Sequence, residues 1–455
     1  MRKSLSWLIS FALLFVTPLS VFAATPKTGS TCSKLNLTQI TGGFKFTCIK
    51  SGKKLVWSKA IPLTPNRKPE ATSTITPDSI ADPKLTERSL FATSEKCKLI
   101  GAFNEPNHLA FQKFSSLTPS TGDVRIIVIF VYFNDIEPDL RQISEWKDHQ
   151  IPRAERDFQL MSYGKLKLKI DFQEKFYKIN RDSIYYKLNT AHDDPPDPDA
   201  NAGQLIIDGM RAADSDVDFS KYSMASVVTP ISSNILYEGY TGFTPTSFDG
   251  KNFGVGLFGS IREYLDKPLE ANWAVHEIGH SLGLPHPYST LVTRSSGNAA
   301  WDAMGYPLTF APDFLGWAKW TLSWLEDNQI DCIDMNQKGT YVSKLSPIGN
   351  IGGTKLIVMR LGTYTAIVIE SRRNSILDKI DLSEEGPLVY LVDIRNTSDQ
   401  GVVKLLYNDP RTRAGINNAR TVIGTLVSSE ELTVFDWKVT YIQRGKDGDF
   451  IKVSN

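Results

Sequence analysis

Residues 275–286 are Val-His-Glu-Ile-Gly-His-Ser-Leu-Gly-Leu-Pro-His, and this stretch holds three of the six histidines in the 455-residue chain. His276 and His280 are four residues apart, so on a helix they share one face and can reach the same metal ion, at about 2.0–2.1 Å. Gly283 is predicted to end this helix in a left-handed conformation, after which the chain turns back. The turn brings His286 to the metal as a third ligand.

Three protein ligands leave a fourth position for water, which is the arrangement of catalytic rather than structural zinc sites. Glu277 directly follows the first ligand, where a carboxylate can act as general base for a zinc-activated water. The stretch therefore predicts a zinc-dependent hydrolase with His276, His280 and His286 as metal ligands and Glu277 as the catalytic base. The alternative is that the histidines are ordinary residues beside a helix end.

The spacing His-Glu-x-x-His-x-x-Gly-x-x-His resembles the zinc signature of the metzincin metalloproteases. That resemblance implies a methionine beneath the zinc, for which Met304 is the candidate, although it could be an ordinary core residue. Tyr306 resembles the tyrosine that binds the metal or the oxyanion in astacins and serralysins, with simple packing as the alternative. In metzincins an edge strand binds the extended substrate, and residues 254–259 are the candidate because their glycines allow close approach.

Other segments resemble two groups of secreted bacterial metalloproteases. Pro287, after the third histidine, is similar to serralysins. The similarity to the immune inhibitor A family lies in residues 216–222, 315–317, 367–373 and 386–393. That family usually carries aspartate as its third ligand, so the histidine of this chain departs from its pattern. The resemblance covers about three quarters of the chain and implies a zinc metalloendopeptidase that hydrolyses internal bonds of protein or peptide substrates.

The first 24 residues have the pattern of a secretory signal peptide. Arg2 and Lys3 give a positive start, residues 8–19 are mostly apolar, and small residues around Ala24 suit cleavage. A transmembrane anchor is the weaker alternative because the run is short and contains a proline, and no later segment approaches about 18 uninterrupted apolar residues. We expect a secreted, extracellular protein that could also associate with the cell surface, without a transmembrane anchor in the mature chain.

Four cysteines are present, and an even number in an exported protein predicts two disulfides. Three pairings are open to four cysteines. We favour Cys32–Cys48, because it closes a short loop, which leaves Cys97–Cys332. Alternatively, Cys97 could bind the zinc as a thiolate and keep a precursor latent.

The chain is predicted to contain four parts after the signal peptide. Residues 25–59 form a small disulfide-stapled module, which resembles short modules of exported bacterial proteins. It either attaches the protein to the cell envelope through residues 32–58 or acts as a spacer. Residues 60–95 are rich in proline, threonine and serine and are typical of a linker. A metzincin-like zinc metalloprotease domain is expected over 96–330 and a β-rich domain over 331–455.

The expected fold class is α/β. The apolar run 124–133 indicates a strand buried on both faces, and residues 165–172 alternate as in a strand with one exposed face. Helical spacing covers 142–161 and 202–213, so strands and helices alternate as in a mixed, mostly parallel sheet that carries the zinc helix. Short strands with turns after residue 330 predict an all-β, sandwich-like C-terminal domain.

Composition adds few constraints. A net charge of +1 gives no field that would attract nucleic acid. The carboxylate-dense stretch 192–199 could bind calcium, although a solvated loop fits it better. Two other functions stay open: a non-proteolytic surface-binding protein on a metalloprotease fold, and a zinc hydrolase of non-peptide amides or esters.

Overall fold

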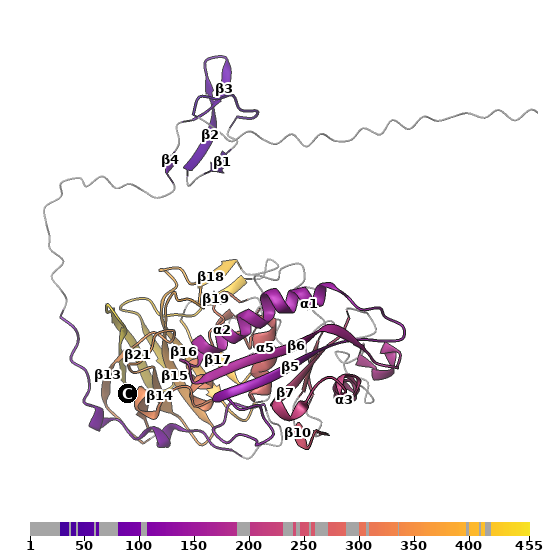
Figure 1. Ribbon diagram of the computed structural model, residues 1–455. Helices are drawn as coiled ribbons and strands as arrows, with labels where there is room; N and C mark the ends of the chain where they lie inside the picture. The colour runs from indigo at the N-terminus through magenta and orange to yellow at the C-terminus, as the bar shows by residue number, and fades with distance from the viewer. Residues whose placement is uncertain are drawn as a thin grey trace, which may run out of the picture. The chain divides into compact units, whose positions relative to one another are not determined.

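The structure is a computed structural model. It describes residues 28–35, 38–41, 44–58, 61–62, 81–101, 107–188, 201–230, 240–242, 246–253, 256–259, 272–287, 300–305, 309–334, 336–396, 400–408, 411–414 and 420–455. The chain divides into two compact units, Met1–Ala81 and Asp82–Asn455 (Figure 1). The predicted signal peptide, the acidic stretch 192–199 and Tyr306 lie outside the described residues, so the structure leaves them as predictions.

The first unit contains a small antiparallel sheet. Its strands are β1 (Thr38–Thr41), β2 (Phe44–Ser51), β3 (Lys54–Trp57) and β4 (Ile61–Pro62), with β2 paired to the other three. Cys32 and Cys48 form a disulfide, and Cys48 packs with Phe46 and Trp57 in a minimal core. The expected local disulfide is confirmed. It stabilises a unit whose few apolar side chains form only a small core.

The α/β part of the second unit is built on a five-stranded sheet of order β6-β5-β7-β11-β8. The strands are β5 (Gly122–Tyr132), β6 (Leu166–Lys178), β7 (Met224–Val228), β8 (Tyr240–Gly242) and β11 (Gly256–Gly259). Three pairings are parallel and only β8 is antiparallel within the described part of the sheet, which confirms the mostly parallel sheet. The expectation that residues 254–259 form the edge strand is wrong, because β11 pairs with β7 on one side and β8 on the other.

Strand β5 shows why this sheet is buried on both faces. Its side chains alternate, with Ile126 and Val128 in one apolar cluster and Ile127 and Ile129 in another. The first cluster includes α2 (Ile151–Met161) and α5 (Trp273–Ser281), whereas the second includes α3 (Ala202–Ala213). The sheet therefore lies between two helical layers, with α5 on the face of α2 (Figure 1).

The remaining helical and short elements complete this part. The predicted helix 142–161 is α1 (Arg141–Glu145), the π-helical turn η3 (Trp146–Gln150) and α2 in succession. The others are α6 (Gly316–Thr321), the 3-10 turns η1 (Arg88–Leu90), η2 (Ser94–Cys97), η4 (Ser183–Tyr186), η6 (Phe219–Lys221) and η8 (Asp327–Gln329), and the hairpin β9 (Thr246–Phe248) and β10 (Lys251–Phe253). Among the described residues, none of the helices has the length and apolar character needed to span a membrane.

The C-terminal part contains two sheets that pack face to face. One has the order β12-β14-β15-β16-β17 and the other β13-β22-β21-β20. Their bounds are β12 (Ile330–Ile333), β13 (Thr340–Leu345), β14 (Leu356–Arg360), β15 (Thr365–Arg372), β16 (Gly386–Asp393), β17 (Val403–Leu405), β20 (Glu431–Val434), β21 (Trp437–Arg444) and β22 (Asp449–Ser454), with a separate hairpin of β18 (Arg411–Ala414) and β19 (Arg420–Ile423). One apolar cluster fills the space between the sheets, so this part is a β-sandwich.

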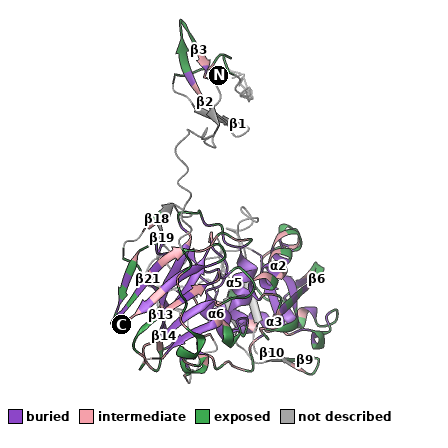
Figure 2. Ribbon diagram, turned by 90° about the vertical axis from the view of Figure 1, so that its left-hand side faces the viewer, coloured by how far each residue is buried: buried purple, intermediate pink, exposed green. Residues whose placement is uncertain are grey.

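The sandwich shares its core with the α/β part. The sandwich sheet β12-β14-β15-β16-β17 has one face turned away from the other sandwich sheet. Val358, Val368 and Tyr390 on this face belong to the same apolar cluster as α5 and α6. Figure 2 shows buried residues throughout this region. The predicted boundary at residue 331 therefore falls inside a continuous core. The domain limits stay a prediction, but the two parts form one compact unit.

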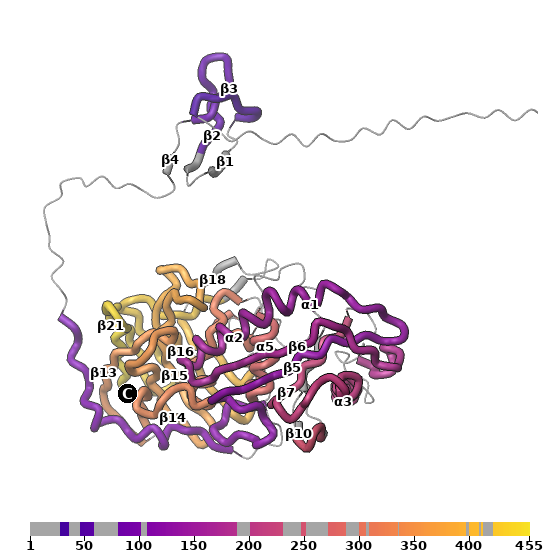
Figure 3. The backbone as a smooth tube through the Cα atoms, in the orientation of Figure 1, coloured from indigo at the N-terminus to yellow at the C-terminus, as the bar shows by residue number. Residues whose placement is uncertain are grey.

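The segment before the α/β part is bound to the sandwich. Cys97 and Cys332 form the second expected disulfide, and both are fully buried. This pairing excludes the alternative in which Cys97 is a thiolate ligand of the zinc. The amide of Thr86 donates to the Val342 carbonyl at 2.9 Å, and residues 82–95, for which a linker was expected, belong to the second unit. Figure 3 shows their backbone running past β13 and β14.

Candidate metal centre

Helix α5 is held at both ends by specific contacts. At its start, the side chain of Gln150 accepts a hydrogen bond from the Ala274 amide at 3.2 Å, one of the amides that a helix leaves without an internal partner. At its end, the Leu284 amide donates to the Gly279 carbonyl at 3.1 Å, and Gly283 has φ 90°. This is a Schellman-type cap. The predicted helix stop at Gly283 is confirmed, and the chain reverses there.

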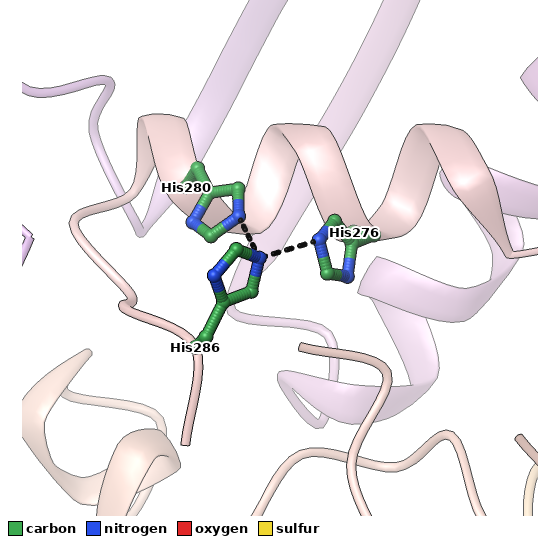
Figure 4. A group of neighbouring side chains, drawn as sticks. All are labelled: His276, His280 and His286. Carbon is green, nitrogen blue, oxygen red and sulfur yellow. Dashed lines mark hydrogen bonds between the residues drawn. The ribbon is translucent and has the colours of Figure 1, made fainter. Parts of the chain in front are cut away.

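The cap brings three imidazoles together. Nε2 of His286 lies 3.2 Å from Nε2 of His276 and 3.1 Å from Nε2 of His280 (Figure 4). Ligands of a tetrahedral zinc at about 2.0–2.1 Å would be about 3.3 Å apart. Both separations from His286 are close to this value, and one possible ligand atom of each histidine lies within 4.8 Å of the others. The three rings therefore form a candidate site for one ion. The two helical histidines are buried and His286 is partly exposed.

The other ring nitrogens explain which atoms face the centre. His276 Nδ1 is 2.7 Å from the Ala303 carbonyl, and His280 Nδ1 is 2.7 Å from the Leu284 carbonyl. Because a carbonyl can only accept, each Nδ1 must donate, and Nε2 of the neutral ring then carries a lone pair. Lone pairs that converge at this distance repel unless a proton or cation lies among them. Backbone support of this kind is what orients metal-binding histidines in general.

Burial also favours the neutral ring. Desolvation, with a smaller contribution from His276, lowers the pKa of His280 to about 3, although the hydrogen bond to Leu284 opposes this. At neutral pH this imidazole is therefore unprotonated, as a metal ligand must be.

Glu277 lies on the same helix, one residue after the first ligand, and is 4% exposed. It lines a small pocket between α5 and the sheet, together with Ser226 and the indoles of Trp146 and Trp273. The walls of this pocket are mainly apolar. A carboxylate in such surroundings is less well solvated than one in water, which suits a group that has to take up a proton. Its role as general base stays a prediction.

The turn of residues 301–305, here called the methionine turn, lies against α5. Its Ala303 carbonyl is the partner of His276, and a Cβ placed on Gly279 would overlap the sulfur of Met304. Met304 thus packs on Gly279, which lies between His276 and His280 in the helix. Its place beneath a zinc ion stays a prediction. The Asp302 carboxylate closes the turn by accepting from the amides of Met304 at 2.7 Å and Leu315 at 2.8 Å.

Two contributions from the sandwich were not predicted from the sequence. The Val403 amide of β17 donates to the carbonyl of Pro287, the residue after His286, at 2.9 Å. Arg372 of β15 is fully buried and donates to the carbonyl of Trp301 in the methionine turn at 2.8 Å. The sequence does contain a sign of the role of Arg372. Glu370 and Arg372 interrupt an apolar strand, and charged side chains in such a strand require buried partners.

Comparisons with known proteins add little. No protein-family model matches the sequence, and no curated protein matches it. One solved structure that is similar is catalytically inactive OgpA from Akkermansia muciniphila in complex with an O-glycopeptide substrate, glycodrosocin. It is 14% identical, with 58% of this chain and 75% of that chain covered and a TM-score of 0.25. Because that score is low, the candidate centre has to be judged from its own residues.

Proposed function

We propose that the protein is a secreted, zinc-dependent endopeptidase of the metzincin type. One observation carries the proposal: the Nε2 atoms of His276, His280 and His286 converge while the Nδ1 atoms of the two helical histidines are bound to backbone carbonyls. Three neutral imidazoles in this arrangement suit zinc and leave one position for water or substrate. A closed structural site would need a fourth protein ligand, and the cluster of possible ligands among the described residues contains only these three histidines.

The chain's own residues supply the rest of the reaction. When bound, zinc acts as a Lewis acid that polarises a carbonyl and acidifies water. Glu277 takes the proton of the attacking water and passes it to the leaving nitrogen of the peptide. The Ala303 and Leu284 carbonyls keep the two helical imidazoles in the tautomer that leaves Nε2 unprotonated. Tyr306 remains a candidate for stabilising the oxyanion, as the metzincin resemblance implies.

The sheet offers a place for an extended substrate. With β11 in the interior, the edge beside α5 belongs to β8 within the described part of the sheet. An extended peptide can add to such an edge through backbone hydrogen bonds. We therefore assign to Tyr240–Gly242 of β8 the substrate-binding role first expected of residues 254–259.

Two disulfides support an extracellular location, because such bonds persist in oxidising compartments. The first unit, with its own disulfide, remains a candidate for attachment to the cell envelope. The motif resemblance favours a serralysin-like or immune inhibitor A-like enzyme among the metzincins. Calcium binding at residues 192–199 stays a minor expectation.

The test compares full-length wild type with Glu277→Ala. Both proteins are expected to hold about one zinc per chain, because Glu277 is not a ligand, and only wild type should cleave casein. A chelator should stop cleavage, and stoichiometric zinc should restore it. If wild type binds zinc yet cuts no protein, with residues 25–81 present or removed, the endopeptidase proposal fails. Turnover of esters or non-peptide amides would then favour a zinc hydrolase of such substrates. If none of these substrates is turned over, a non-proteolytic binding protein is favoured.

A further inference from the structure

Arg372 connects the sandwich to the methionine turn. It lies at the end of β15, its side chain is fully buried, and Nη2 donates to the carbonyls of Trp301 at 2.8 Å and Asp313 at 3.0 Å. The same nitrogen is 3.5 Å from the Ala311 carbonyl. The guanidinium group also lies over the Trp301 ring, 5.6 Å from its centroid. One side chain therefore holds two backbone segments, the methionine turn and residues 311–313.

Buried carboxylates fix this guanidinium in place. Nη1 donates to Glu370 Oε1 at 3.0 Å, and Nη2 lies 3.2 Å from Asp378 Oδ2. Glu370 Oε2 in turn accepts from the Gly316 amide at 2.6 Å and from the Tyr390 hydroxyl at 2.7 Å. A buried charge is tolerated when it is paired. Both terminal nitrogens of this guanidinium have partners, whereas Nε has none among the described residues. The planar fork of arginine suits several fixed acceptors at once, which a lysine cannot reproduce.

The path from Arg372 to the metal centre is short. Trp301 is two residues from Ala303, whose carbonyl orients His276, and three residues from Met304, which packs on Gly279. The Ala303 amide donates to the Pro312 carbonyl at 3.2 Å, so the two clamped segments are also bound to each other. A shift of the clamp would therefore move the acceptor of a ligand histidine.

We propose that Arg372 is a positioning residue of the metal centre: it clamps the methionine turn so that the Ala303 carbonyl holds His276 in its ligand tautomer and orientation. This inference rests on the proposed function, because it assumes that the three histidines bind zinc. It gives the β-sandwich a role in building the centre. Groups that support metal ligands typically contribute about 10- to 100-fold to metal affinity.

The neighbouring Arg373 provides a matched control. It is also largely buried, and its Nη2 forms an ion pair with Asp449 at 2.6 Å and donates to the carbonyls of Gly445 at 3.1 Å and Gly448 at 2.9 Å. Within the described part of the chain, its hydrogen-bond partners lie in residues 445–449, away from the methionine turn. Loss of Arg373 should therefore disturb a buried charge of similar kind without touching that turn.

The experiment compares Arg372→Lys, Arg373→Lys and wild type as full-length proteins. Circular dichroism and thermal unfolding report folding, competition with a chromogenic chelator gives the zinc Kd, and hydrogen exchange reports the amides of residues 301–305. We expect Arg372→Lys to raise the zinc Kd by about 10- to 100-fold and to speed exchange in the methionine turn. Arg373→Lys should leave the zinc Kd within about twofold of wild type, since it has no part in this path.

A folded Arg372→Lys protein with the wild-type zinc Kd and unchanged exchange would overturn the inference and leave the proposed function intact. If Arg372→Lys does not fold, Asp378→Asn decides, because asparagine keeps a carbonyl oxygen for the Asp313 amide but removes one charge from the clamp. A rise in zinc Kd of about threefold or more supports the inference, and an unchanged value overturns it. Absence of zinc from wild type would overturn both proposals, whereas zinc binding without cleavage would overturn only the endopeptidase.

Discussion

The ligands of the candidate metal centre and the groups that hold them come from differently organised regions. His276, His280 and His286 lie within eleven consecutive residues, on one helix and its cap. Their supports come from remote segments: the Ala303 carbonyl, the Arg372 clamp, and the Val403 amide bound to Pro287. The proposed metal ligands are thus specified locally, and their positioning depends on tertiary structure. Local changes should abolish the reaction, and remote changes should weaken metal binding without removing it.

The largest effect is expected at the third ligand. His286→Ala should lower zinc affinity by more than the roughly 100-fold that supporting groups reach, since it removes a ligand rather than its support. His286→Asp should lose less, because a carboxylate can also bind zinc and aspartate is the usual third ligand in the immune inhibitor A family. Equilibrium dialysis with zinc measures both. Equal zinc Kd values for His286→Ala and wild type would contradict the assignment of His286 as a ligand.

The two disulfides offer a comparison of the same kind. Cys97–Cys332 joins residues 235 positions apart within the second unit, whereas Cys32–Cys48 closes a separation of 16 within the first. Replacing Cys97 and Cys332 by serine should destabilise the second unit by about 2–4 kcal/mol. Serines at 32 and 48 should leave the unfolding of that unit and the zinc Kd unchanged. Denaturant unfolding of both double variants tests this, and similar losses from both would contradict it.

A smaller effect is expected where the methionine turn meets the helix. Gly279→Ala places a methyl group where the Met304 sulfur lies, and overpacking of this kind costs about 1–3 kcal/mol. Gly209→Ala on α3 is the control, since its Cβ would lie 2.8 Å from Val227, on the other face of the sheet. Both variants should unfold at lower denaturant concentration. Only Gly279→Ala should also weaken zinc binding, and equal zinc Kd values would argue against a supporting role for Met304.

The last prediction concerns another remote contact with the helix end. The His108 amide donates to the Gly283 carbonyl, and its Nδ1 accepts from the Ala110 amide. Burial, with a contribution from Lys113, lowers the pKa of His108 to about 4 from 6.5. The unfolded chain therefore binds more protons than the native state between these values, so stability falls as pH drops from 6.5 to 4.

His108→Asn should make that pH dependence shallower, because asparagine can replace the acceptor but cannot take up a proton. The free energy of unfolding of zinc-free protein, measured from about pH 7 to about pH 4 for both forms, is the readout. An unchanged slope would mean that His108 does not titrate differently in the folded and unfolded chains.

The sequence predicted the local features well. The period of helix α5, the left-handed Gly283 and the mostly parallel sheet follow from spacing and turn chemistry, and the structure agrees. Spacing left three cysteine pairings open, and the favoured one is observed. The edge strand was misplaced because strand order depends on pairings between distant segments, which the local pattern of residues 254–259 does not contain. Arg372 received no role for the same reason, since its carbonyl partners lie far earlier in the chain, at Trp301 and Asp313.

The most direct test of the proposed centre is X-ray absorption at the zinc edge, on full-length protein purified with its metal. We predict one zinc per chain, bound by three imidazole nitrogens and one further oxygen at about 2.0–2.1 Å, with one imidazole lost in His286→Ala. A protein without stoichiometric zinc, a sulfur ligand, or a spectrum that His286→Ala leaves unchanged would contradict the assignment of His276, His280 and His286 as the ligands.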